Sequence, residues 1–135
     1  CDTSHVDAGA YGQFRANFGV VDPLFGGWVC GGAPLDWLYG PLLMSAPTAE
    51  SRRMARSRTL SGSDSPRAIE LVRALGAGRA FVYSMGQEPW LRYLLALAYE
   101  PDSRPIVESD RFVAWCHDHG IESRRLFGRD EMCLP

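Results

Sequence analysis

The sequence predicts an α/β fold, because a buried strand, a tight turn and a buried helix follow one another in the second half of the chain. Residues 81–83 form an aromatic and β-branched run after two glycines, which is typical of a strand. Gly86 suits a sharp turn, and Pro89 suits the first turn of a helix. Residues 90–99 contain a single charged side chain, which favours a helix buried on several sides. Strands followed by helices predict packed α/β layers.

The first part of the chain predicts one helix and one short strand. Apolar residues spaced along one face predict a helix over residues 8–18, and Gly19 is a suitable end for it. Residues 20–25 predict a short strand, and Pro23 places it at the edge of a sheet. Residues 26–34 are rich in glycine and predict a loop. Residues 35–44 are mostly apolar but are interrupted by Gly40 and Pro41, so they predict either an irregular loop or two short helical turns.

Two further helices are expected in the second part of the chain. Residues 51–67 are rich in serine and arginine, which predicts an exposed segment. Ser65 is a suitable N-cap for a helix that ends at Gly76. Ser109 is expected to cap another helix that reaches about His119. The remaining residues predict a short, mostly polar tail.

Composition restricts the class of protein. The chain has 135 residues, of which 46% are hydrophobic and 22% charged, so it is expected to form at most one folded domain. No apolar run approaches the ~20 residues needed to span a bilayer, and the net charge of −2 disfavours nucleic acid, so neither membrane nor nucleic acid is an expected partner. The four cysteines lack paired spacing, which indicates free thiols and a reducing, cytoplasmic location.

Five words of the sequence occur in an order that identifies a family resemblance. They are CGGAPLDWLYGPLL, SRTLSGSD, SMGQEPWL, PIVES and RLFG. With these words the chain resembles, from about Asp2 to Glu131, the C-terminal part of metallo-β-lactamase-fold proteins akin to the di-iron β-hydroxylases of non-ribosomal peptide synthesis. The resemblance implies that residues 1–135 are a single partial domain, the second half of an αββα sandwich, whose partner is the missing N-terminal half. A mature lipoprotein beginning at Cys1 is the alternative for the start of the chain.

The resemblance also implies a dinuclear metal centre, of zinc or iron, in the parent protein. Asp2 falls near the aspartate that bridges the two ions in this superfamily, a role that suits a carboxylate with two donor oxygens. His5 is a candidate for a nearby supporting group. The alternative for Asp2 is a solvated carboxylate. The chain lacks the H-x-H-x-D-H cluster that supplies most ligands, so no metal is expected in the isolated chain.

Four residues are candidates for lining a pocket. Gln87 and Glu88 lie where the predicted strand passes into the predicted helix, a place where ligands bind in open α/β folds. A helix cap that locks the turn is the alternative for this pair. Trp37 and Tyr39 either line a substrate cleft or belong to the core. No catalytic residue is assigned.

Two polar clusters have ordinary structural interpretations. His117 and His119 are two apart on a predicted helix, so their side chains should point in different directions rather than share a metal. Their position near the helix C-terminus is favourable for solvated histidines. The arginines of residues 52–58 form the basic cluster of the chain, for which a solvated face is expected; a phosphate or acidic-partner site is the alternative.

Three functions remain open at the level of sequence. The resemblance favours part of a metal-dependent hydrolase in which metal-activated water attacks a small-molecule or carrier-bound substrate, with the isolated chain inactive. The second hypothesis is part of a di-iron oxygenase, which requires iron, dioxygen and an electron source. The third is a non-enzymatic interaction domain that uses its arginine-rich segment as the contact surface. Because half a sandwich exposes apolar surface, the partial-domain hypothesis predicts an open apolar face.

Overall fold

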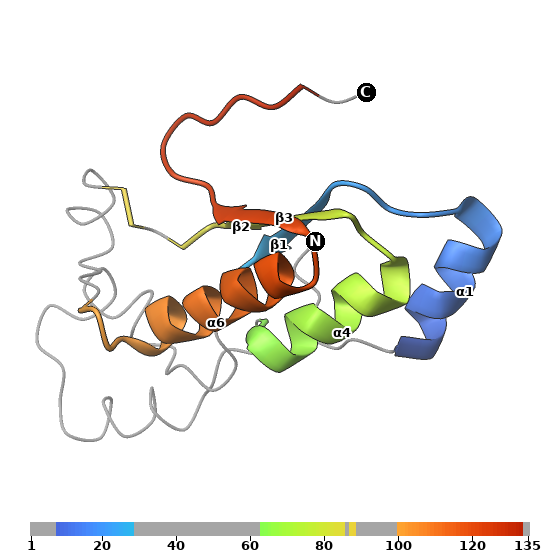
Figure 1. The fold of residues 1–135 in the computed structure, drawn as a ribbon, viewed down its shortest axis with the longest axis horizontal. Helices are drawn as coiled ribbons and strands as arrows, with labels where there is room; N and C mark the ends of the chain where they lie inside the picture. The colour runs from blue at the N-terminus through green and yellow to red at the C-terminus, as the bar shows by residue number, and fades with distance from the viewer. Residues whose placement is uncertain (1–7, 29–62, 86, 89–99, 134–135) are drawn as a thin grey trace, which may run out of the picture.

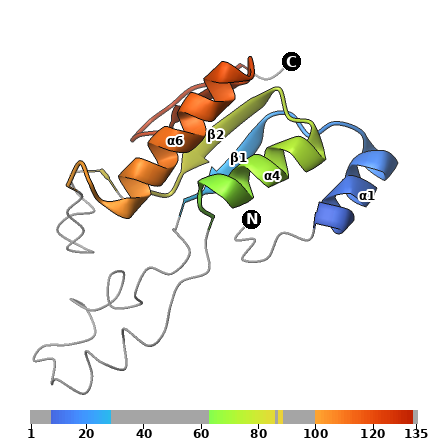
Figure 2. The same cartoon turned by 60° about the horizontal axis from the view of Figure 1, so that its bottom comes forward.

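The computed structural model describes residues 8–28, 63–85, 87–88 and 100–133. In the described part, three parallel strands form one sheet, and two helices, α4 and α6, cover one of its faces (Figures 1 and 2). This arrangement confirms the predicted α/β class. The elements in chain order are α1 (Ala8–Phe18), β1 (Leu24–Gly27), α4 (Ser65–Leu75), β2 (Arg79–Tyr83), α6 (Arg104–Asp118) and β3 (Glu122–Arg125).

The sheet has the order β1-β2-β3, so β2 is central and hydrogen-bonds to both neighbours. Leu24 pairs with Ala80 and Arg79 pairs with Glu122, and both pairs are parallel. The amino-terminal end of the sheet is fixed by Asp22. Its Oδ1 accepts a hydrogen bond from the backbone N–H of Arg79 at 2.7 Å, and its Oδ2 pairs with the Arg79 Nε at 3.1 Å. This double contact holds the start of β1 against the start of β2.

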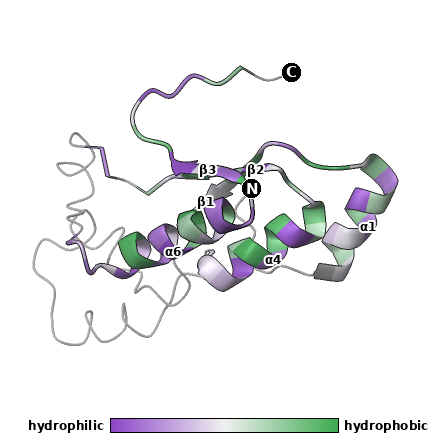
Figure 3. Ribbon diagram, viewed as in Figure 1, coloured by the Kyte–Doolittle hydropathy of each residue, from purple (hydrophilic) through white to green (hydrophobic). Residues whose placement is uncertain are grey.

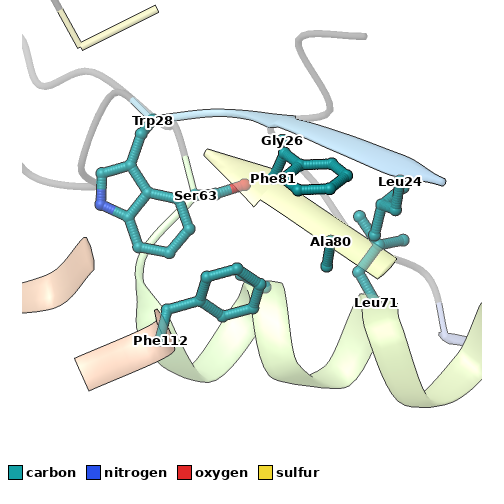
Figure 4. A pocket seen from close by; sticks show the side chains of 9 residues that line it. Leu24, Gly26, Trp28, Ser63, Leu71, Ala80, Phe81 and Phe112 are labelled. Carbon is teal, nitrogen blue, oxygen red and sulfur yellow. The ribbon is translucent and has the colours of Figure 1, made fainter. Parts of the chain in front are cut away.

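The core lies between the sheet and the two helices. Ala80 and Val82 point from β2 toward these helices, because alternate residues of a strand point to opposite faces. Trp28, directly after β1, packs its ring 5.1 Å from that of Phe112 on α6 (Figure 4). Figure 3 shows hydrophobic and hydrophilic residues on different sides of α4, as a helix with one buried face requires. Burial of these apolar side chains is the main stabilising contribution.

The predicted cap of α4 is shifted by one residue. Asp64, and not Ser65, is the N-cap: its Oδ1 accepts from the backbone N–H of Arg67 at 3.2 Å. Ser65 is the first helical residue, and its own N–H donates to Glu108 Oε2 on α6 at 3.1 Å. Aspartate and serine are both favourable N-cap residues. Asp64 is the N-cap here because its backbone is extended and the first helical residue is Ser65. The predicted end is confirmed, because Gly76 adopts a left-handed conformation with φ 70°.

The predicted start of the other long helix is wrong. Helix α6 begins at Arg104, so Ser109 lies inside it, fully buried, and donates its hydroxyl to the carbonyl of Ile106 at 2.9 Å. Ser103 occupies the N-cap position, and Pro105 lies in the first turn, where its missing N–H costs nothing. Ser109 was predicted as an N-cap because serine is a favourable residue at that position, but its side chain is buried inside α6.

Strand β3 was not expected in the polar tail. Its sequence, ESRR, has no apolar alternation, and one of its residues, Ser123, is buried. Contacts with its neighbours hold it in place. Its backbone pairs with β2, Arg125 reaches Asp110 on α6 at 2.6 Å, and His117 Nε2 bonds the carbonyl of Ser123 at 2.8 Å.

The other element predictions have mixed outcomes. The helix over Ala8–Phe18 and its end at Gly19 are confirmed, although the aromatic side chains Phe14 and Phe18 are exposed. Among the strands that the structure describes, the first lies at the edge of the sheet, as predicted, but it spans Leu24–Gly27. The predicted loops at 29–44, the arginine-rich segment up to residue 62 and the predicted helix at 90–99 lie outside the described residues.

Two free cysteines in the described part, Cys116 and Cys133, should differ strongly in reactivity. Cys116 is fully buried, and burial raises the pKa of its thiol above the ordinary 9.0, with a smaller opposing effect from the Ser123 side chain. Because the thiolate is the reactive form, an alkylating reagent should modify exposed Cys133 first. Cys116 should be alkylated only as fast as the chain unfolds and exposes it. Mass spectrometry of digested peptides measures the labelling of Cys116 and Cys133 separately. Equal labelling rates under native conditions would contradict this packing.

The same burial determines the effect of alkaline pH. The folded chain retains the Cys116 proton to higher pH than the unfolded chain does, so the free energy of unfolding should fall as pH rises above about 9. This loss should be absent in Cys116→Ala, which serves as the control.

Candidate functional site

The carboxyl ends of the three strands meet at one edge of the sheet. On one side of β2, the backbone N–H of Trp28 donates to the carbonyl of Tyr83 at 3.0 Å. On the other side, the N–H of Leu126 donates to the carbonyl of Val82 at 2.8 Å. Ser84 is therefore the first residue of the central strand beyond the sheet. In open α/β sheets, this edge is where ligands bind.

Two of the predicted pocket residues lie just beyond this edge. Gln87 and Glu88 follow β2 within five residues of its end, and both are half-buried. Both residues follow the central strand, and their role in lining a pocket stays a prediction. Whether Glu88 caps a helix stays a prediction, because residues 89–99 lie outside the described part of the chain.

Ser84 also lies at this edge of the sheet, and the sequence does not single it out. It is exposed and has a positive φ of 60°, while Met85 next to it is buried. Positive φ is uncommon for residues other than glycine and is a property of the folded backbone. The residue types around Ser84 do not predict a positive φ at this position.

The other candidates cannot be placed in the site. Asp2, His5, Trp37 and Tyr39 lie outside the described residues. Within the ranges that are described, no group of three or more histidine, cysteine, aspartate or glutamate side chains is arranged to hold a metal ion. The described residues by themselves therefore do not fit a dinuclear centre.

His117 and His119 each have a separate partner. His117 bonds the carbonyl of Ser123, and His119 Nδ1 bonds the carbonyl of Trp115 at 2.8 Å. A carbonyl only accepts, so the ring nitrogen donates in each case. The imidazole of His119 also stacks on the Trp115 indole, with ring centroids 4.1 Å apart. These contacts agree with the prediction that the two side chains point in different directions.

The face of the sheet opposite α4 and α6 carries an aromatic patch. It consists of Phe25 on β1, Phe81 on β2 and the Arg124 guanidinium on β3. The two phenylalanine rings lie 5.7 Å apart, and the Arg124 guanidinium carbon lies 5.3 Å from the centre of the Phe81 ring. Phe81 is buried, but Phe25 remains 42% exposed. Phe127, just after β3, is also exposed.

A small cavity lies inside the fold, between the sheet and the helices (Figure 4). Apolar side chains such as Leu24, Leu71 and Phe112 dominate its lining, and Ser63 contributes a hydroxyl. It has space for about one water molecule. This cavity is a packing gap and is too small for a substrate. In the part of the chain that the structure describes, no helix has the length and apolar character needed to cross a membrane.

The comparisons with known proteins point to one enzyme. No family model matches the chain. It is 37% identical over 133 residues to the 4-amino-L-phenylalanyl-[CmlP-peptidyl-carrier-protein] 3-hydroxylase of Streptomyces venezuelae, covering 98% of this chain and 24% of that protein. The crystal structure of CmlA, a di-iron β-hydroxylase from Streptomyces venezuelae, matches with a TM-score of 0.66 and 39% identity over 86% of this chain and 22% of CmlA.

A variant of the same enzyme gives the same result. The CmlA E377D mutant matches with a TM-score of 0.65 and 34% identity, over 94% of this chain and 23% of the mutant. These matches support the di-iron oxygenase hypothesis better than the hydrolase hypothesis that the sequence favoured first. The chain spans about a quarter of the length of the relative it matches. The chain is homologous to the C-terminal part of the CmlA-type di-iron β-hydroxylases.

Proposed function

We propose that the protein to which this chain belongs is a di-iron oxygenase that hydroxylates an aminoacyl group held on a carrier protein. The observation that supports it is 37% identity over 98% of the chain to a hydroxylase of a carrier-bound 4-amino-L-phenylalanyl group. A fold match with a TM-score of 0.66 to a di-iron β-hydroxylase supports the same function. Because the relative is about four times longer, the activity belongs to the whole protein rather than to these 135 residues.

The chain would act as one half of a larger metallo-β-lactamase-like sandwich. In this proposal, residues 1–135 are a partial domain, and the second sheet packs on the face that carries Phe25, Phe81 and Arg124. Partial exposure of Phe25 on that face supports it, since large apolar side chains favour a partner surface. The other half of the domain is then the first partner of this chain.

The iron ligands would come mainly from outside the described residues. The described ranges hold no group of side chains arranged to bind a metal ion. Asp2 remains the proposed bridging carboxylate and His5 a neighbouring group. When bound, the two irons would supply the activation of dioxygen. Trp37, Tyr39, Gln87 and Glu88 remain the proposed residues around the substrate.

The activity of the full-length protein tests this function. We expect the iron-loaded protein, given dioxygen and a reductant, to add one oxygen atom to an aminoacyl group on a peptidyl carrier protein. Mass spectrometry of the loaded carrier should show a gain of about 16 Da, the mass of one oxygen atom, with the second oxygen atom reduced to water. The zinc-loaded protein is the control and should be inactive. Hydrolysis of the thioester by the zinc form, without oxygen incorporation, would instead favour the hydrolase.

A further inference from the structure

We propose that Ser84 is a substrate-contacting residue whose hydroxyl hydrogen-bonds a polar group of the carrier-bound aminoacyl substrate. This inference rests on the proposed function and extends it to a residue that sequence reasoning did not select. Among the described residues, Ser84 is the single non-glycine residue with positive φ, whereas Gly19, Gly76, Gly120 and Gly128 occupy the other positive-φ positions.

A left-handed conformation has a cost for any residue with a Cβ, and glycine avoids this cost. In the turn after β2, exposed Ser84 has a φ of 60° and is followed by buried Met85. Glycine would make the same turn without strain. Serine carries this cost at φ 60°, and residues with strained backbone cluster at ligand-binding sites, so the Ser84 side chain is a candidate for a ligand contact.

The location of Ser84 indicates what that use is. The last backbone hydrogen bonds on either side of β2 end at Val82 and Tyr83, so Ser84 lies directly outside the carboxyl edge of the central strand. Ligands of parallel α/β sheets bind at this edge. The Ser84 side chain is exposed, and a hydroxyl can both donate and accept a hydrogen bond. A carbonyl or amine of an aminoacyl thioester is a suitable partner for it.

Two substitutions in the full-length protein separate the backbone from the hydroxyl. Ser84→Gly removes both the strain and the hydroxyl, and should raise the Tm while lowering kcat/KM. Ser84→Ala removes the hydroxyl alone, and should lower kcat/KM about three- to tenfold, mainly through KM, with little change in Tm. The probe is a peptidyl carrier protein loaded with a 4-amino-L-phenylalanyl group, and its Kd for each variant is measured by titration calorimetry.

Gly120→Ser is the matched control. Gly120 has φ 70°, and a Cβ added there would meet no atom within 4 Å, so this variant places a serine at positive φ without a clash. It precedes β3 and therefore lies at the opposite end of the sheet from Ser84. It should lower the Tm and leave kcat/KM and the Kd of the loaded carrier unchanged.

The outcomes decide between substrate contact and turn geometry. Wild-type kcat/KM, KM and Kd in Ser84→Ala would overturn the inference. An unchanged or lower Tm in Ser84→Gly would overturn its backbone premise, whatever the activity. A wild-type protein that neither binds nor oxidises the loaded carrier would overturn the proposed function instead, while the Tm comparison of Ser84→Gly with Gly120→Ser still tests the strain.

Discussion

Replacement of Phe112 by alanine should lower the free energy of unfolding by about 3–5 kcal/mol. Phe112 is 3% exposed and fills the space between α6 and the sheet, where its ring packs on Trp28 at 5.1 Å. The substitution removes apolar contacts and enlarges a gap that the fold already contains beside this residue. Equilibrium unfolding of the chain in urea, followed by tryptophan fluorescence, measures the change.

Phe127→Ala is the control for Phe112→Ala, because it deletes the same side chain from a position that is 53% exposed. Its effect should stay within about 0.5 kcal/mol. Similar losses for the two variants would mean that the core is not centred on Phe112 and Trp28.

Replacement of Glu108 by alanine should destabilise the chain by about 1–3 kcal/mol. Glu108 Oε2 accepts from the backbone N–H of Ser65 at 3.1 Å, at the N-terminus of α4, and its side chain is largely buried. Without this acceptor, a backbone donor of a buried residue loses its partner. The carboxylate also interacts favourably with the positive end of the α4 dipole. The same urea titration measures the loss.

Arg111→Ala removes the ion pair of Glu108 but leaves its hydrogen bond to the backbone N–H of Ser65 at the start of α4. The Arg111 Nη1 lies 3.0 Å from Glu108 Oε1, but its side chain is two-thirds exposed, so this pair should contribute less than about 1 kcal/mol. If Arg111→Ala were as destabilising as Glu108→Ala, the main role of Glu108 would be the surface pair and not the cap.

Local sequence was sufficient for elements whose apolar pattern and end signals lie within the element itself. Helix α1 was predicted with its observed bounds, and the end of α4 followed from Gly76, which can take positive φ. Strand β2 was evident from its aromatic and β-branched residues. The family resemblance likewise rested on words in the sequence, and the comparison with CmlA confirmed it.

Features that depend on contacts between residues far apart in the sequence could not be predicted from local sequence. The start of α6 was misplaced, because Ser109 is a possible cap by type but faces a core assembled from other elements. The α4 cap depends in part on Glu108, which lies 43 residues away from Ser65. Gln87 and Glu88 were predicted as pocket residues because they lie between a predicted strand and a predicted helix. Ser84 was not predicted, because its positive φ is a property of the folded backbone.

The sequence by itself determined the α/β class, the presence of strand β2, the presence of helices α4 and α6 and the resemblance to di-iron β-hydroxylases, because each of these depends on residue type and order. Tertiary structure alone decided that the polar residues Glu122–Arg125 form a strand and that Ser84 adopts a left-handed conformation. The physical reason is that a strand forms when its backbone donors and acceptors find those of a neighbour, here β2. The backbone of Ser84 is likewise fixed by the sheet before it and the buried Met85 after it.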